Sequence, residues 1–124
     1  MSRHDDLVRL RHMLDHSREA VGLLHGKTRA DLKNTRLLEL GLVRLVEIVG
    51  EAGARVSKEE RAKHPEIPWD DVVGMRNRLI HGYDMVDLEI LWDTVRDDLP
   101  RLIAVLERIV PPEDERGEPQ GRRV

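Results

Sequence analysis

Three side chains capable of acid–base or phosphate chemistry fall close together in the sequence, at Arg76, His81 and Tyr83. Histidine exchanges protons readily near neutral pH, whereas arginine carries a permanent charge. A histidine can take the proton of an RNA 2′-hydroxyl or protonate the leaving oxygen, while an arginine neutralises charge on the phosphorus oxygens. Arg76 and His81 therefore suit metal-independent RNA cleavage, for which no cofactor is expected.

Arg76 has an unusual position for a charged residue. On a helical wheel of about 100° per residue it lies at the centre of an apolar stripe, whereas Arg78 falls on the polar side. The stripe consists of Val72, Val73, Leu79 and Ile80. A buried guanidinium is costly unless it is paired or faces a solvated cleft. Two interpretations stay open: Arg76 pairs with Glu47 or Glu51 and stabilises the fold, or it lines a cleft where chemistry occurs.

One histidine supplies only one of the two proton transfers that this cleavage needs. A homodimer that brings two copies of the motif to one cleft would supply both. The helix predicted over residues 36–56 fits this idea because it is apolar on two sides. One side carries Leu38, Leu42, Leu45 and Val49, and the other carries Leu40, Val43 and Val46. We therefore interpret this helix both as core and as a candidate self-association surface.

The elements that must position these residues are all predicted to be helical. Apolar residues spaced three and four apart predict helices over residues 5–24 and 36–56, with a cap for the second at 28–31. A shorter helix is expected over 68–80, ending at His81 with Gly82 in a left-handed conformation. The last helix covers 87–110, and Pro100 predicts a kink near residues 96–99.

The expected fold class is all-α: an antiparallel helical bundle of three long helices and one shorter one. Residues 1–110 form the bundle domain, while residues 111–124 contain almost nothing apolar and are expected to be a disordered tail. A short helical turn is expected at 57–60. Trp69 and Trp92 are interpreted as core anchors.

Composition narrows the class of protein. The 24 acidic and 21 basic residues give a formal charge of −3, which argues against a protein that coats nucleic acid nonspecifically. No cysteine is present, so disulfides and cysteine-bound metals are excluded. No apolar run long enough for a membrane span occurs, and we expect a soluble, cytoplasmic protein without a membrane partner.

Several segments together resemble the signature region of HepT toxins, a group within the HEPN proteins. Residues 64–69 (His-Pro-Glu-Ile-Pro-Trp) precede residues 74–83 (Gly-Met-Arg-Asn-Arg-Leu-Ile-His-Gly-Tyr). Val86-Asp87, Leu91-Trp92 and Leu99-Pro100 follow, and residues 47–52 are similar to the second-helix motif of the family. All motif positions are present, and only the C-terminal tail lies outside the match.

The resemblance implies a HEPN-like bundle and a homodimeric, metal-independent ribonuclease, the toxin of a type II/VII-like toxin–antitoxin system. Arg76 and His81 carry over as catalytic residues, with Asn77 as a polar contributor. The resemblance further implies an antitoxin partner, a minimal nucleotidyltransferase of the MNT type. This partner would silence the toxin by transferring AMP from ATP to Tyr83.

Other histidines, and other classes of protein, also fit parts of the sequence. His12 and His16 are four apart, as metal ligands on a helix can be, but no third ligand is evident. His64 is interpreted as a packing or hydrogen-bonding residue. A histidine phosphotransfer domain would need His81 exposed in mid-helix. A catalytically silent module that only binds the nucleotidyltransferase also stays open.

Overall fold

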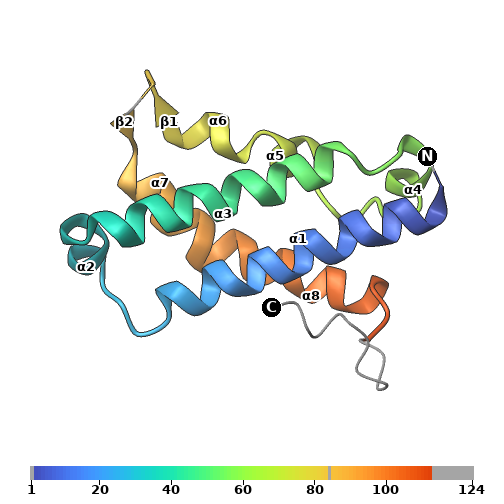
Figure 1. Cartoon of the computed structure of the whole chain (residues 1–124), viewed down its shortest axis with the longest axis horizontal. Coiled ribbons are helices and arrows are strands. Elements are labelled where there is room, and N and C mark those ends of the chain that lie inside the picture. The colour runs from blue at the N-terminus through green and yellow to red at the C-terminus, as the bar shows by residue number, and fades with distance from the viewer. Residues whose placement is uncertain (1, 84, 113–124) are drawn as a thin grey trace.

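The computed structural model describes residues 2–83 and 85–112. The helices over residues 3–24 and 36–54 and the helical segment over residues 88–109 run along the molecule, and residues 69–79 lie beside the second of these helices (Figure 1). The elements in chain order are α1 (Arg3–Leu24), α2 (Arg29–Asn34), α3 (Arg36–Ala54), α4 (Lys58–Ala62), α5 (Trp69–Val73), α6 (Met75–Leu79), β1 (Ile80–His81), β2 (Met85–Val86), α7 (Leu88–Asp93), η1 (Thr94–Asp98) and α8 (Leu99–Ile109). The all-α bundle predicted from the sequence is confirmed, and the tail at 113–124 lies outside the described residues.

The core lies around α1, which packs against α3 on one side and against α8 on another. Its centre is aliphatic, and the side chains there are at most 1% exposed. They include Leu10, Leu14, Leu42, Val46, Val49, Leu91, Leu99 and Leu106. Trp92 belongs to this core and Trp69 packs against it, as predicted. Within the described residues, none of the helices combines the length and the apolar character needed to span a membrane.

Two buried carboxylates tie the start of α1 to α4. Asp6 accepts hydrogen bonds from the backbone and the hydroxyl of Ser57 at 2.8 and 2.7 Å. Burial alone would raise the pKa of Asp6, but these bonds outweigh it and hold the pKa below its usual value. Glu60 bonds Arg3 at 2.8 Å and His64 at 2.9 Å. His64 is therefore a hydrogen-bonding residue, as predicted.

The chain differs from the sequence prediction between the first two long helices. Thr28 accepts a hydrogen bond from the backbone of Asp31, and Asp31 bonds back to the Thr28 backbone, forming a capping box. This cap opens the separate short helix α2, rather than α3. Helix α3 starts only after Thr35, which forms no side-chain cap.

The helix expected over residues 68–80 is broken into α5 and α6 at Gly74. Helix α5 meets α3 closely just before this break. A Cβ placed on Gly50 of α3 would lie 3.1 Å from the carbonyl oxygen of Val72 and 3.4 Å from that of Val73. The last carbonyls of α5 therefore rest directly on the α3 backbone, where only a glycine leaves enough room.

After α6 the chain forms a small antiparallel hairpin that the sequence did not predict. Ile80 pairs with Val86 and His81 pairs with Met85. Gly82 has a φ of 74°, so its predicted left-handed conformation is confirmed, although it serves the hairpin turn and not a helix end. His81 accordingly lies in β1, one residue beyond the α6 cap at Ile80.

The last long helix is interrupted near the predicted position. Helices α7 and α8 are joined by η1, a π-helical turn over Thr94–Asp98. Pro100 lies in the first turn of α8, where its missing N–H is tolerated. The kink predicted near residues 96–99 is therefore replaced by a π-helical turn that directly precedes α8.

The close contact at Gly50 yields a stability prediction. Gly50→Ala forces the methyl group against the Val72 carbonyl, and we expect a loss of about 1–3 kcal/mol in the free energy of unfolding. Gly22→Ala in α1 is the matched control, because a Cβ there meets nothing within 4 Å. The control should gain about 0.5–1 kcal/mol from helix propensity. Urea unfolding of both variants checks this, and equal gains in both would contradict the close packing of α5 on α3.

Candidate active site

The predicted motif lies on α6 and the hairpin that follows it. In Figure 1 the hairpin projects from the end of the α5–α6 segment, beyond the N-terminal half of α3. Arg76 and the exposed Asn77 belong to α6, and His81 belongs to β1. Tyr83 lies in the turn of the hairpin and is 97% exposed. The motif therefore occupies a surface and not the interior of the bundle.

Arg76 is paired with a carboxylate from another helix. Its Nε lies 3.1 Å from Oε2 of Glu47 in α3, and Oε1 of the same glutamate lies 3.0 Å from Arg44. The pairing with Glu47 that the sequence suggested is confirmed. The Arg76 side chain is 46% exposed, so it does not lie within an apolar stripe as the continuous helical wheel placed it. The break at Gly74 removes the continuous wheel on which that stripe was drawn.

His81 has a carboxylate neighbour of its own. Its Nε2 lies 3.7 Å from Oδ2 of Asp87, the residue that caps α7, and the imidazole side chain is 62% exposed. Within the described part of the chain, no ion pair or hydrogen bond joins Arg76 directly to His81. Each of the two lies near an acid from a different element: Arg76 near Glu47 of α3, and His81 near Asp87 at the start of α7.

This geometry can perform the chemistry expected from the sequence. An exposed imidazole beside a carboxylate can exchange a proton with a bound ligand. Arg76 contacts Glu47 through Nε, and the guanidinium has further N–H donors on its terminal amines that could bind a phosphate. His81 lies on a strand, so the mid-helix exposure that a phosphotransfer histidine would need is not met.

Two residues beside the site, Arg44 and Asp87, were not predicted from the sequence to lie there. Arg44 shares Glu47 with Arg76, a relation that only the packing of α6 on α3 creates. Asp87 was placed at the start of the last helix, and an aspartate at that position is a recognisable N-cap. Its closeness to His81, however, depends on the hairpin, for which the sequence analysis gave no prediction.

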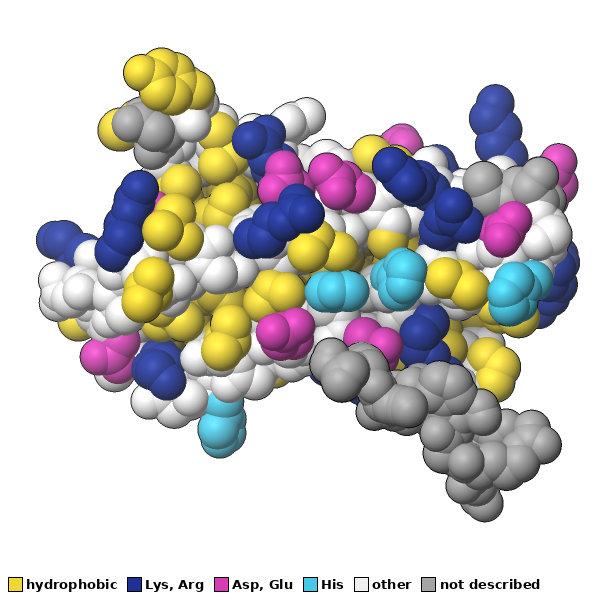
Figure 2. All heavy atoms as spheres, in the orientation of Figure 1, with side chains coloured by type: hydrophobic (Ala, Val, Ile, Leu, Met, Phe, Trp, Pro, Cys, Tyr) yellow, Lys and Arg dark blue, Asp and Glu magenta, His cyan; other side chains and the backbone are white. Residues whose placement is uncertain are grey.

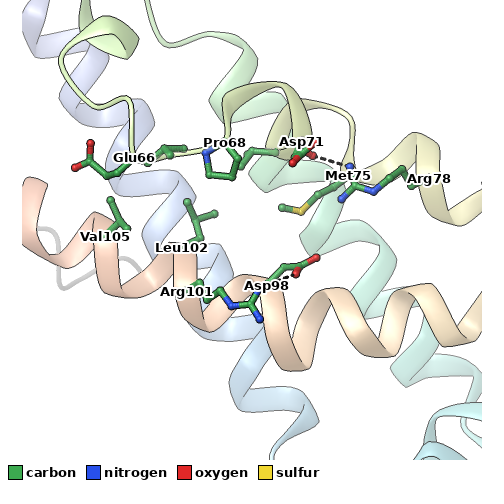
Figure 3. Close-up of a pocket in the computed structure, with 11 residues that line it drawn as sticks. Glu66, Pro68, Asp71, Met75, Arg78, Asp98, Arg101, Leu102 and Val105 are labelled. Carbon is green, nitrogen blue, oxygen red and sulfur yellow. Dashed lines mark hydrogen bonds and ion pairs between the residues drawn. The ribbon is translucent and has the colours of Figure 1, made fainter.

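A sizeable cavity lies elsewhere on the molecule. It has a volume of about 530 Å³ and opens between the α5–α6 segment and α8, with Arg78 beside Asp71 on one side and Arg101 beside Asp98 on the other (Figure 3). Neither Arg76 nor His81 lines it. Arg78 donates to the backbone oxygen of Asp71 at 3.0 Å, which agrees with its predicted role as an ordinary surface residue.

No metal site accompanies the motif in residues 2–83 and 85–112, where no group of three or more potential ligands is found. His12 and His16 pack edge to face with ring centroids 6.1 Å apart. The Nδ1 of His16 lies 2.8 Å from the backbone oxygen of His12. Burial, followed by the neighbouring His16, lowers the pKa of His12.

Large apolar side chains are exposed around the same end of the molecule. Figure 2 shows hydrophobic atoms gathered over the hairpin and over the N-terminal half of α3. Leu37 is 81% exposed and Leu40 is 47% exposed. Leu23, Tyr83 and Met85 are also exposed. Val46 is wholly buried in the core, so the second apolar side of α3 predicted from the sequence is displaced toward Leu37 and Leu40.

Comparisons with known proteins agree with the motif. The sequence model of the family described as Ribonuclease HepT-like matches residues 13–109. The chain is 36% identical over 95 residues to "Probable ribonuclease HepT" of Thermococcus cleftensis, covering 73% of this chain and 86% of that protein. It is 30% identical over 102 residues to "Putative RNase MJ1380" of Methanocaldococcus jannaschii, covering 82% and 94%. It is 34% identical over 101 residues to "Putative RNase TTE0752" of Caldanaerobacter subterraneus subsp. tengcongensis, covering 82% and 90%. No solved structure matches the chain significantly.

Proposed function

The chain belongs to the HepT-like ribonuclease family, and we propose that it is a metal-independent endoribonuclease that acts as the toxin of a toxin–antitoxin system. One observation carries the proposal. Arg76 and His81 each lie beside a carboxylate from another element, and their side chains are 46% and 62% exposed. This exposure leaves both groups within reach of a bound phosphate.

The proposed reaction uses each group for one task. His81 takes the proton of the 2′-hydroxyl, and the 2′-oxygen forms a bond to phosphorus as the bond to the 5′-oxygen breaks. The products are a 2′,3′-cyclic phosphate and a 5′-hydroxyl. Arg76 donates to the phosphate oxygens on which charge develops, while Asn77 beside it is a further polar contact.

The leaving 5′-oxygen also requires a proton, and we propose that a second copy of the chain supplies it. A symmetric dimer would bring a second His81 to the same cleft, where one imidazole acts as base and the other as acid. The exposed side chains of Leu37 and Leu40 support this arrangement. Both residues lie in the N-terminal half of α3, at the end of the molecule where the hairpin carries His81 (Figure 1). Covering them would bury apolar surface that the single chain leaves in water.

We propose that the antitoxin is a minimal nucleotidyltransferase of the MNT type that transfers AMP to Tyr83. The phenol of Tyr83 is 97% exposed and lies two residues from His81, so an enzyme can reach it. An attached adenylate adds a negatively charged phosphate near the site and a nucleoside in the space that RNA would occupy. Both effects oppose binding of the substrate.

The catalytic hypothesis predicts that Arg76→Ala and His81→Ala each lower the rate of RNA cleavage at least about 10²-fold, with growth toxicity lost in parallel. Cleavage by the parent should persist in EDTA. Arg78→Ala is the matched control on the same helix and should keep the parent rate. Because the Arg76–Glu47 pair is half exposed, Arg76→Ala should cost at most about 1 kcal/mol of stability. Parent-like cleavage by either catalytic variant, or RNA left intact by the parent, would contradict the hypothesis.

The dimer hypothesis predicts that Leu37→Glu and Leu40→Glu together weaken self-association at least about tenfold, because a charge is placed in apolar contact. Val8→Glu is the control, because Val8 is also exposed but lies near the N-terminus of α1. That end of α1 is at the other end of the molecule from the start of α3 (Figure 1). Val46 is unsuitable for this test because a charge there would disrupt the core. Light scattering at micromolar concentration makes the measurement, and a monomeric parent would rule out the dimer.

The modification hypothesis predicts an AMP-sized increase in the intact mass of the protein after incubation with its nucleotidyltransferase, ATP and Mg²⁺. The increase should be absent from Tyr83→Phe, which retains the aromatic ring without the acceptor oxygen. RNA cleavage by the parent should fall as the modified fraction rises. An unchanged mass in the parent, or an increase that persists in Tyr83→Phe, would exclude Tyr83 as the acceptor.

A further inference from the structure

Asp87 is fixed by the backbone on two sides. Its N–H donates to the carbonyl oxygen of Leu79 at 2.8 Å, directly after the paired residues of the hairpin. Its side-chain Oδ1 accepts the N–H of Ile90 at 3.0 Å and so caps α7. The first contact ties the residue to the end of α6 and the second ties it to the start of α7. The carboxylate therefore has little freedom to turn.

The second oxygen of this carboxylate is not needed for the cap. Oδ2 lies 3.7 Å from Nε2 of His81. The hairpin creates this proximity, since His81 pairs with Met85 and the returning strand reaches Asp87 two residues later. The Asp87 carboxylate thus caps the start of α7 with Oδ1 and lies near the His81 imidazole with Oδ2.

We propose that Asp87 is a positioning residue for His81, an inference that rests on the proposed ribonuclease function. A carboxylate beside Nε2 favours the tautomer that carries its proton on Nε2, because an ionised carboxylate can only accept a hydrogen bond. A small rotation of the exposed ring closes 3.7 Å to hydrogen-bond distance. Nδ1 then presents its lone pair to the substrate.

The proton balance is simple in this arrangement. The 2′-hydroxyl proton moves to Nδ1 as the 2′-oxygen bonds to phosphorus, while Nε2 keeps its own proton. Asp87 stays ionised throughout and stabilises the imidazolium by its charge, without taking a proton. Glu47 plays a comparable part for Arg76, but it holds a group of fixed charge and so selects no protonation state.

Two substitutions separate this role from helix capping. Asp87→Asn and Asp87→Ser both retain a side-chain oxygen that can cap α7, so the unfolding midpoint should stay close to that of the parent. Asparagine places a donor where Oδ2 was and favours the opposite tautomer, whereas serine is too short to reach the ring. We expect kcat for RNA cleavage to fall about 10²- to 10⁴-fold in Asp87→Asn, with KM changed less than about threefold.

The ring nitrogens give a readout that does not depend on RNA cleavage. Imidazole ¹H–¹⁵N correlation spectra of the resting protein, with the His81 signals identified by their absence from His81→Asn, report which nitrogen carries the proton. The parent should show Nε2–H for the neutral ring, and Asp87→Asn should show Nδ1–H. Parent spectra with Nδ1–H, or identical spectra in the two proteins, would overturn the positioning role. An inactive parent with the expected spectra would instead refute the proposed function and leave the positioning role standing.

Discussion

The candidate site depends on one close approach between two helices. Because Gly50 lacks a side chain, the terminal carbonyls of α5 lie directly on α3, and α6 continues along the same helix. Arg76 is then near enough to reach Glu47, although the two residues are far apart in the sequence. A wider spacing would leave Arg76 on a free surface without a partner, and its conformational entropy would oppose any fixed geometry.

The two charged groups of the site are restrained without being buried. A buried guanidinium would incur a large desolvation cost, and a fully solvated one would be free to move. Arg76 and His81 avoid both extremes because their acidic partners are themselves held, Glu47 by a long helix and Asp87 by the backbone. The arrangement preserves access for a ligand and still limits the orientations of the reactive atoms.

The long helices could be predicted from the sequence because their apolar periodicity extends over many turns. The bounds expected for the first two, 5–24 and 36–56, agree closely with α1 and α3. The site was less predictable. The break at Gly74 occurs where α5 packs on α3, and the proximity of Asp87 to His81 depends on a short hairpin. Helical periodicity within one segment predicts neither feature. The catalytic pair itself was found through residue chemistry and the spacing of the motif, which need no knowledge of packing.

The hairpin that carries His81 has only two residue pairs in its ladder. An isolated ladder of this length is not stable in water. The hairpin is therefore stabilised by the hydrogen bond between Asp87 and Leu79 and by the Asp87 cap of α7. Opening it exposes little apolar surface, in contrast to separating α1 from α3. The reactive end of the molecule therefore has a lower local free energy of opening than its core. On warming, the geometry around His81 should be lost while the long helices are still intact, with amide exchange faster in the hairpin than in α1 and α3.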